Sequence, residues 1–177
     1  MNFPNLKISS QLSIFLFFLL VSTTTTTTKA ISSPSYLVNR ICKNTLNYNK
    51  CWAILGSDSQ AKTTTDYRVL AKTALQLSIL STKDSLNFLI RKIESEQEVV
   101  KALKECAIWY DNAIKAFKNA MNEINMGKLA DYHTFMNQAH YCQIALKNRY
   151  LPSVSQINSQ LELYSDINFV ITKILKQ

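Results

Sequence analysis

The sequence predicts an all-α fold, an antiparallel up-down four-helix bundle preceded by a helical hairpin and crosslinked by two disulfides. After the first 30 residues the chain holds only two glycines and two prolines, which is too little turn punctuation for a many-stranded sandwich or barrel. Apolar residues recur instead at steps of three and four over long stretches, which is the period of an amphipathic helix. The four cysteines form an even set, as is typical of disulfide-bonded secreted domains.

The first 30 residues have the parts of a cleavable secretory signal peptide. Lys7 stands in a short polar start, an apolar core follows from Ile14 to Val21, and a run of threonines comes next. The apolar core is too short to span a bilayer, which needs roughly 20 residues. We expect cleavage after Ala30, although a cut near Ser22 or Thr23 also fits the small-residue pattern.

Removal of residues 1–30 leaves 147 residues, enough for one domain with its own core. We expect the hairpin over residues 31–60 and the bundle over residues 61–177, which together make a single domain, 31–177. The mature chain carries 18 basic and 12 acidic side chains, a net charge of +6 against +8 for the whole sequence. This surplus is moderate and scattered, and with secretion it argues against nucleic-acid binding. No second apolar span follows, so no membrane attachment is expected.

Two short helices are expected at the start of the mature chain, over Tyr36 to Thr45 and Tyr48 to Leu55. Cys42 lies on the first of them and Cys51 on the second. The two arms would therefore form a hairpin that one disulfide can clamp.

The first bundle helix is expected from about Thr64 to Glu94. Its core-facing residues at helical spacing are Leu75, Ile79, Leu86, Leu89 and Ile93. The second helix has the strongest period in the chain, an unbroken alternation of steps over Val99, Leu103, Cys106, Tyr110, Ala113, Phe117, Ala120 and Ile124. Ser95 and Glu98 have the spacing of a capping box at its start, and Gly127 stands where a left-handed C-terminal cap is wanted.

A third helix is expected from about Lys128 to Arg149. Its predicted inward residues are Leu129, Tyr132, Met136, Ala139 and Leu146. Pro152 then ends the connection to a fourth helix, which runs to the C-terminus with an apolar stripe of Val154, Ile157, Leu161, Tyr164, Ile167, Ile171 and Ile174. Four long amphipathic helices with short joints favour an antiparallel bundle.

The cysteines can be placed on these elements. Cys106 lies on the inward stripe of the second bundle helix and Cys142 on the third, so antiparallel packing can bring them within bonding distance. Cys42 and Cys51 sit on opposite arms of the hairpin. Local pairing is favoured because the alternative pairings would tie the hairpin to the bundle and strain both. Those alternatives stay open from the residues alone.

Residues along nearly the whole mature chain also match a known pattern. The matching residues are Ile41, Cys42, Thr45, Tyr48, Cys51 and Leu55 in the hairpin, Leu70, Ala71 and Ala74 in the first bundle helix, Ala102, Leu103, Cys106, Tyr110, Ala113 and Ala120 in the second, Ala139 and Cys142 in the third, and Ser165, Asp166 and Ile167 to Leu175 at the end. In these positions the chain resembles the plant invertase and pectin methylesterase inhibitor family.

The resemblance implies a secreted four-helix bundle with an N-terminal hairpin, in which Cys42 pairs with Cys51 and Cys106 with Cys142. It also implies that residues 31–177 are one inhibitor domain. Such a domain is not an enzyme and needs no cofactor. Its partner would be a pectin methylesterase or an acid invertase, bound in a one-to-one complex that occludes the active-site cleft. The implied location is the apoplast or cell wall, with the vacuole as the alternative.

Two departures from the family pattern bear on the target. Some invertase inhibitors of the family carry a Pro-Lys-Phe segment before the third bundle helix, where this chain reads Gly127, Lys128 and Leu129. Only the lysine is retained, which favours pectin methylesterase over acid invertase by a slim margin. The small residues usual before the last cysteine are replaced by residues 137–141, so contacts from that helix do not transfer.

Candidate partner contacts are Trp109, Lys128, Leu129 and Asp131. Trp109 lies beside the second helix's stripe rather than on it, and it could serve as an interface anchor or simply flank the core. Lys128, Leu129 and Asp131 stand at the predicted start of the third helix. They could contact a partner or be ordinary solvated end residues.

Catalytic and metal sites find no support in the sequence. His133 and His140 are seven residues apart, which separates them by about 10 Å along a helix, so one metal ion cannot join them. Neither glycine lies in a phosphate-binding loop, and no serine or cysteine nucleophile motif is present. The alternative to an inhibitor is therefore a binding or structural bundle that contacts pectin weakly through its positive charge or holds an apolar ligand.

Overall fold

The structure, a computed structural model, describes residues 36–95, 97–129, 137–146 and 151–177. Within these ranges the elements are α2 (Tyr36–Cys42), α3 (Tyr48–Leu55), α4 (Ser59–Thr63), α5 (Tyr67–Ser95), the 3₁₀ turn η1 (Gln97–Val99), α6 (Val100–Asn125), α7 (Gln138–Ala145) and α8 (Pro152–Leu175). No strand occurs in the described ranges, and none of their helices is long and apolar enough to cross a membrane. The all-α prediction is confirmed.

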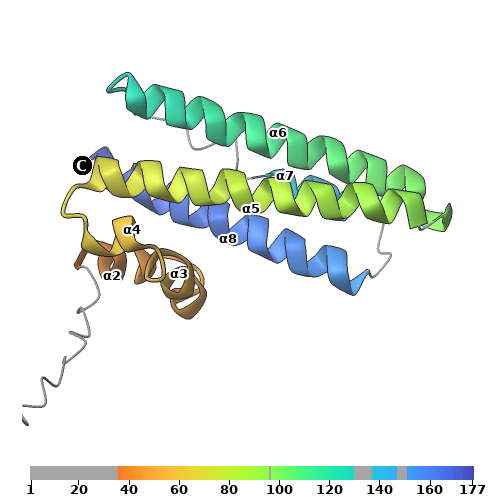
Figure 1. Ribbon diagram of the computed structural model, residues 1–177, viewed down its shortest axis with the longest axis horizontal. Helices are drawn as coiled ribbons and strands as arrows, with labels where there is room; N and C mark the ends of the chain where they lie inside the picture. The colour runs from red at the N-terminus through yellow and green to blue at the C-terminus, as the bar shows by residue number, and fades with distance from the viewer. Residues whose placement is uncertain (1–35, 96, 130–136, 147–150) are drawn as a thin grey trace, which may run out of the picture. The chain divides into compact units, whose positions relative to one another are not determined.

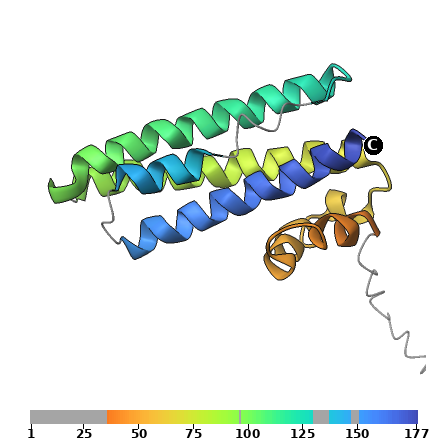
Figure 2. The ribbon, with the colours of Figure 1, turned by 180° about the vertical axis from the view of Figure 1, so that it is seen from behind.

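Helices α5, α6, α7 and α8 form the bundle (Figure 1). α5 packs against α6 and α8, and α7 packs against the same two helices, so each helix has two neighbours around the core. Consecutive helices run in opposite directions, which can be followed from both sides in Figures 1 and 2. The up-down topology predicted from the short connections is confirmed.

The stripe on α6 forms the centre of the core. All eight residues predicted to face inward on this helix and just before it, from Val99 to Ile124, are buried, and Tyr110 and Phe117 are among the largest fully buried side chains. On α8, five of the seven predicted stripe residues are buried, whereas Ile157 and Ile174 are half-buried. The alternating steps of three and four residues therefore reported the buried faces correctly.

The core-facing side of α5 is more polar than its leucines and isoleucines suggest. Leu75 and Leu89 are buried as predicted, whereas the predicted Ile79, Leu86 and Ile93 are half-buried. Between the two leucines, the polar residues Ser78, Thr82 and Ser85 are buried. The three hydroxyls donate to backbone carbonyl oxygens one turn earlier, at 2.6 to 3.0 Å. Because this satisfies each hydroxyl within its own helix, a buried serine or threonine costs little at these positions.

The capping box predicted at Ser95 and Glu98 is wrong. α5 continues through Ser95, whose hydroxyl donates back to the carbonyl oxygen of Lys92 at 3.2 Å. η1 follows, and α6 starts at Val100 with no side-chain cap from Val99. The last turn of α5 thus uses the serine that the pattern assigned to the start of α6.

The left-handed cap predicted at Gly127 is confirmed. Gly127 has a φ of 75°. The Lys128 N–H donates to the carbonyl oxygen of Glu123 at 2.8 Å and the Gly127 N–H donates to that of Ile124 at 3.0 Å. These two bonds are the pair that defines a Schellman motif.

The third bundle helix differs from its prediction. Lys128 and Leu129 are not helical and Leu129 is 39% exposed, so the start at Lys128 and the inward position of Leu129 are wrong. In the described range 137–146 the helix is α7, with Ala139 and Cys142 buried. Tyr132, Met136 and Arg149 lie outside the described residues. Pro152, in contrast, takes the first position of α8 as predicted, where its missing N–H costs nothing.

The hairpin packs on α8. α3 has its predicted bounds, whereas α2 ends at Cys42 because the chain turns there and the Thr45 hydroxyl donates to the Cys42 carbonyl oxygen at 2.8 Å. The backbone N–H of Leu46, in the turn between the arms, donates to Oδ2 of Asp166 on α8 at 2.7 Å. The short helix α4, capped by Asp58, was not predicted.

Both disulfides join the predicted partners. Cys42 is bonded to Cys51 with a Cα–Cα distance of 5.4 Å, and Cys106 is bonded to Cys142 with a Cα–Cα distance of 4.4 Å. All four cysteines are buried, and none of them is free. One bridge closes the hairpin and the other joins α6 to α7, so the alternative pairings are excluded.

Candidate functional site

A stacked aromatic pair lies between α6 and α7. The rings of Trp109 and Tyr141 have centroids 4.6 Å apart and planes inclined by 29°. Trp109 is half-buried and Tyr141 is 38% exposed. Such a pair presents large apolar area together with an indole N–H and a phenol O–H, a combination common in protein interfaces.

The aromatic pair is fixed by the bundle disulfide. Cys106 lies one turn before Trp109 on α6, and Cys142 directly follows Tyr141 on α7. Both cysteines of the bridge are fully buried. Because the covalent bond sets the spacing of the two helices at this level, the rings are held in a defined relative position.

Two exposed isoleucines lie close to the bridge in the sequence but not on the face of the aromatic pair. Ile108 is 60% exposed and Ile144 is 56% exposed. Each stands two residues from a bridged cysteine, which turns its side chain by about 200° around the helix axis and away from the bridge. We call the stacked pair of Trp109 and Tyr141 the aromatic patch.

The sequence-predicted contact residues do not all come together. Trp109 is part of the aromatic patch, but Lys128 and Leu129 follow the cap of α6, and the stretch of α6 from Trp109 to Asn125 alone spans about 24 Å. Both are exposed. Asp131 lies outside the described residues.

Tyr141, one of the two members of the aromatic patch, was missed by sequence reasoning. Tyr141 could have been found, since it is adjacent to the cysteine that pairs with Cys106, and Trp109 is one turn from Cys106. A paired cysteine on each of two helices therefore signals which neighbours meet.

Comparison with known proteins assigns this architecture to a family. The model of the family described as plant invertase/pectin methylesterase inhibitor matches residues 36–160. The chain belongs to this family. Members are inhibitors and not enzymes, so this inhibitor is not expected to have catalytic residues of its own. No curated protein matches the chain.

Solved structures show the same fold as this inhibitor. The mutant form A of a pectin methylesterase inhibitor from Arabidopsis is 21% identical with a TM-score of 0.68, over 77% of this chain and 95% of that one. A pectin methylesterase inhibitor from Arabidopsis thaliana is 22% identical with a TM-score of 0.57, over 81% of this chain and 98% of that one. At these identities the likeness concerns the helical bundle alone.

The buried phenol of Tyr110 has a structural role in the inhibitor. Its hydroxyl donates to Oδ1 of Asn158 on α8 at 2.7 Å, and both residues are fully buried. Burial raises the pKa of Tyr110 far above its ordinary value, and the negative charge of Glu162 raises it further. A phenol that stays protonated at every physiological pH links α6 to α8 and does not act as an acid or base.

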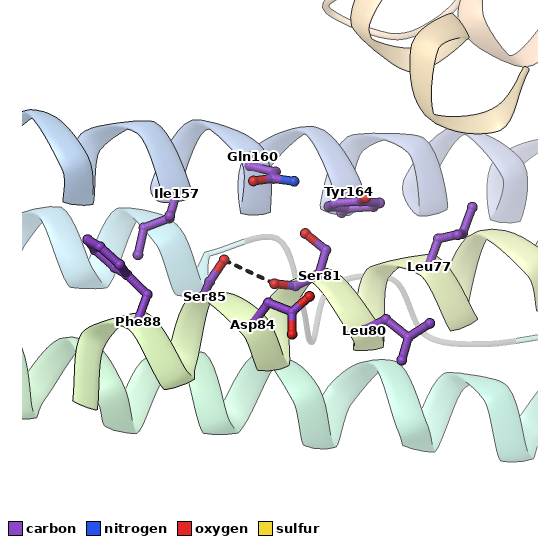
Figure 3. A pocket seen from close by; sticks show the side chains of 9 residues that line it. All are labelled: Leu77, Leu80, Ser81, Asp84, Ser85, Phe88, Ile157, Gln160 and Tyr164. Atoms are coloured by element: carbon purple, nitrogen blue, oxygen red, sulfur yellow. Dashed lines mark hydrogen bonds between the residues drawn. The ribbon is translucent and has the colours of Figure 1, made fainter. Parts of the chain in front are cut away.

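Two grooves flank α8 on the inhibitor's surface. The first, of about 470 Å³, lies between α5 and α8 (Figure 3). Phe88 and Ile157 stand at one end of it and Leu77 and Leu80 at the other, with the Asp84 carboxylate between them. The second groove, of about 420 Å³, lies between α3 and α8. No group of three or more residues suited to hold a metal ion is found in the described part of the chain.

Proposed function

We propose that this inhibitor binds a pectin methylesterase in a one-to-one complex and blocks its substrate cleft with the aromatic patch. The observation that carries the proposal is the Trp109–Tyr141 stack beside a buried disulfide. Tryptophan and tyrosine are the commonest anchors of protein interfaces. A surface that is rigid before binding also loses little conformational entropy on binding.

The choice of target rests on the segment after α6. The Pro-Lys-Phe element of some invertase inhibitors is replaced here by Gly127, Lys128 and Leu129. The N–H groups of Gly127 and Lys128 are used in the Schellman motif that ends α6. This supports pectin methylesterase as the target, with acid invertase as the second candidate of the same family.

The other predicted contact residues form a second, outer contact region in this proposal. Lys128 and Leu129 are exposed at the end of α6, and Asp131 follows them in the sequence. We propose that Lys128 and Leu129 touch the rim of the enzyme's cleft rather than its centre, because α6 separates them from the aromatic patch. Asp131 stays a predicted contact.

We place the inhibitor outside the cell, in the apoplast. The family is extracellular, and the first 30 residues have the composition of a signal peptide. Residues 1–35 lie outside the described part of the chain, so the cleavage site and the boundary at residue 30 stay predictions. The boundary at residue 60 also stays a prediction, and residue 60 lies within α4. N-terminal sequencing of the exported protein would locate the first of them.

The test is an inhibition titration of the mature chain against a pectin methylesterase and an acid invertase at acidic pH. We expect loss of pectin methylesterase activity at equal molar ratio and no loss of invertase activity. Trp109→Ala should weaken inhibition by about 30-fold, the effect of removing an interface anchor worth roughly 2 kcal/mol. The matched control is Ile90→Ala, since Ile90 is 46% exposed on α5, a helix that carries no residue of the patch.

Three outcomes would each contradict one part of the proposal: the target enzyme, the docking surface or the inhibitory function itself. Inhibition of invertase alone would reject the target. Full inhibition by Trp109→Ala, together with a native circular dichroism spectrum, would reject the aromatic patch as the docking surface. Inhibition of neither enzyme would favour the non-inhibitory binding bundle.

A further inference from the structure

The groove between α3 and α8 is built from two helix faces. Lys50, Ala53 and Ile54 follow one another at the spacing of a single face of α3, and Gln156, Ser159, Gln160 and Leu163 do the same on α8. The two faces enclose about 420 Å³. Leu163, which is 8% exposed, and the half-buried Ile54 form an apolar floor.

The rim of this groove is formed by polar side chains that do not bind other described residues of the protein. Lys50, Gln156, Ser159 and Gln160 are all exposed. Within the described residues their side chains make no hydrogen bond and no ion pair, and no carboxylate lines the groove. One ammonium, two amides and one hydroxyl are therefore free to bind a ligand that carries a carboxylate and several hydroxyl groups.

The neighbouring α5–α8 groove has the opposite charge. It shares Gln160 as a wall, but its charged side chain is Asp84, and no lysine or arginine lines it (Figure 3). Asp84 makes no ion pair within the described part of the chain. An anionic ligand is therefore attracted to the α3–α8 groove and repelled from the α5–α8 groove, although the two lie on either side of one helix.

We propose that the α3–α8 groove binds a galacturonate unit of demethylated pectin. The carboxylate meets the ammonium of Lys50, the ring hydroxyls exchange hydrogen bonds with Gln156, Ser159 and Gln160, and the C–H face of the sugar covers the apolar floor. A methyl-esterified unit lacks the charge that Lys50 recognises. The inference rests on the proposed target, because hydrolysis of the methyl ester produces this carboxylate.

Binding of this kind concentrates the inhibitor where pectin has already been demethylated. A single exposed lysine–carboxylate pair is weak, so one sugar unit is held loosely. Successive units along a polymer raise the local concentration of ligand at the groove and prolong retention. The product of the target enzyme thereby brings the inhibitor to the place where the enzyme is active.

The test is a titration of the isolated mature protein with trigalacturonate and with its methyl ester, followed by NMR shifts at low salt. Trigalacturonate should shift the amides of α3 and of the middle of α8 and bind more tightly than the ester. Lys50→Gln should weaken binding by about three- to fivefold, as expected for loss of an exposed ion pair. Ala53→Glu, which places a carboxylate in the groove, should abolish it.

Lys104→Gln is the matched control, since Lys104 is an exposed lysine on α6 and should leave trigalacturonate binding unchanged. Equal binding of the methyl ester, or equal weakening by both lysine variants, overturns the proposed site. No enzyme is present in this titration, so its failure leaves inhibition untouched. Conversely, a Lys50→Gln protein that still inhibits but binds trigalacturonate less tightly shows that the groove acts apart from the aromatic patch.

Discussion

At the scale of single residues, the most consequential polar group is Asp166 on α8. It is 8% exposed and accepts the N–H of Leu46 from the hairpin turn. Burial raises the pKa of Asp166, and the Leu46 hydrogen bond opposes that rise without cancelling it. The carboxyl makes no ion pair within the described residues, so its protonation depends on burial and on this one contact.

Asp166 makes stability depend on pH in a predictable direction. A raised pKa means that the folded protein holds the proton more tightly than the unfolded chain, whose aspartate pKa is about 3.9. The stabilisation is therefore complete below about pH 4 and is lost as pH rises through the folded pKa. Asp166→Asn keeps a carbonyl acceptor for Leu46 but carries no charge. The free energy of unfolding of this variant, relative to that of the native protein, should therefore increase with pH.

Urea unfolding between pH 3.5 and 7 measures this difference. Asp84→Asn, which removes an exposed carboxylate, is the control for loss of a charge: a trend seen with Asp166→Asn alone belongs to the buried position. Parallel pH profiles for the native protein and Asp166→Asn would show that Asp166 does not supply the pH dependence.

At the scale of elements, the end of α6 is set by one backbone conformation. Gly127 has a φ of 75°, and a Cβ added there would meet no atom within 4 Å. Replacement by alanine therefore meets no steric obstacle from neighbours and costs only backbone conformational energy. Gly127→Ala should lower the free energy of unfolding by about 1 kcal/mol.

Gly127→Asn tests whether the loss of stability comes from the left-handed backbone conformation, since asparagine tolerates that region better than alanine does. Urea denaturation should rank the native protein first, Gly127→Asn second and Gly127→Ala last. An alanine variant as stable as the native protein would mean that the cap contributes nothing to α6.

At the scale of the whole molecule, the two disulfides support two different surfaces. The Cys106–Cys142 bridge underlies the aromatic patch, and the Cys42–Cys51 bridge holds the hairpin that forms one wall of the α3–α8 groove. They span sequence separations of 36 and 9 residues. Loop-closure entropy predicts stabilisation on the order of 4 and 3 kcal/mol, respectively.

Removing each bridge in turn should separate the two activities. The double variant C106A/C142A should lose inhibition more than trigalacturonate binding, because its patch is no longer held. The double variant C42A/C51A should do the reverse. Thermal unfolding of both confirms that each is folded at the assay temperature. Equal losses of inhibition and of trigalacturonate binding in both variants would contradict the proposal that each bridge supports a different surface.

The sequence by itself determined the helical class, the inward faces of α6 and α8, the cap at Gly127 and the start of α8 at Pro152. These features depend on the spacing of apolar residues and on backbone preferences, both of which are set by residues close together in the sequence. It failed at Ser95 and at Lys128, because one residue can end one helix or begin the next, and only packing decides which. The disulfide pairing was favoured by topology but left open.

Only the tertiary structure decided which exposed residues work together. Trp109 was a candidate by its position beside the stripe, but its partner Tyr141 comes from another helix, and the separation from Lys128 follows from the length of α6. Lys50 becomes a candidate ligand residue only because α3 lies along Gln156 and Gln160 of α8. A surface assembled from distant segments has no period of its own, so its members meet only once the chain has folded.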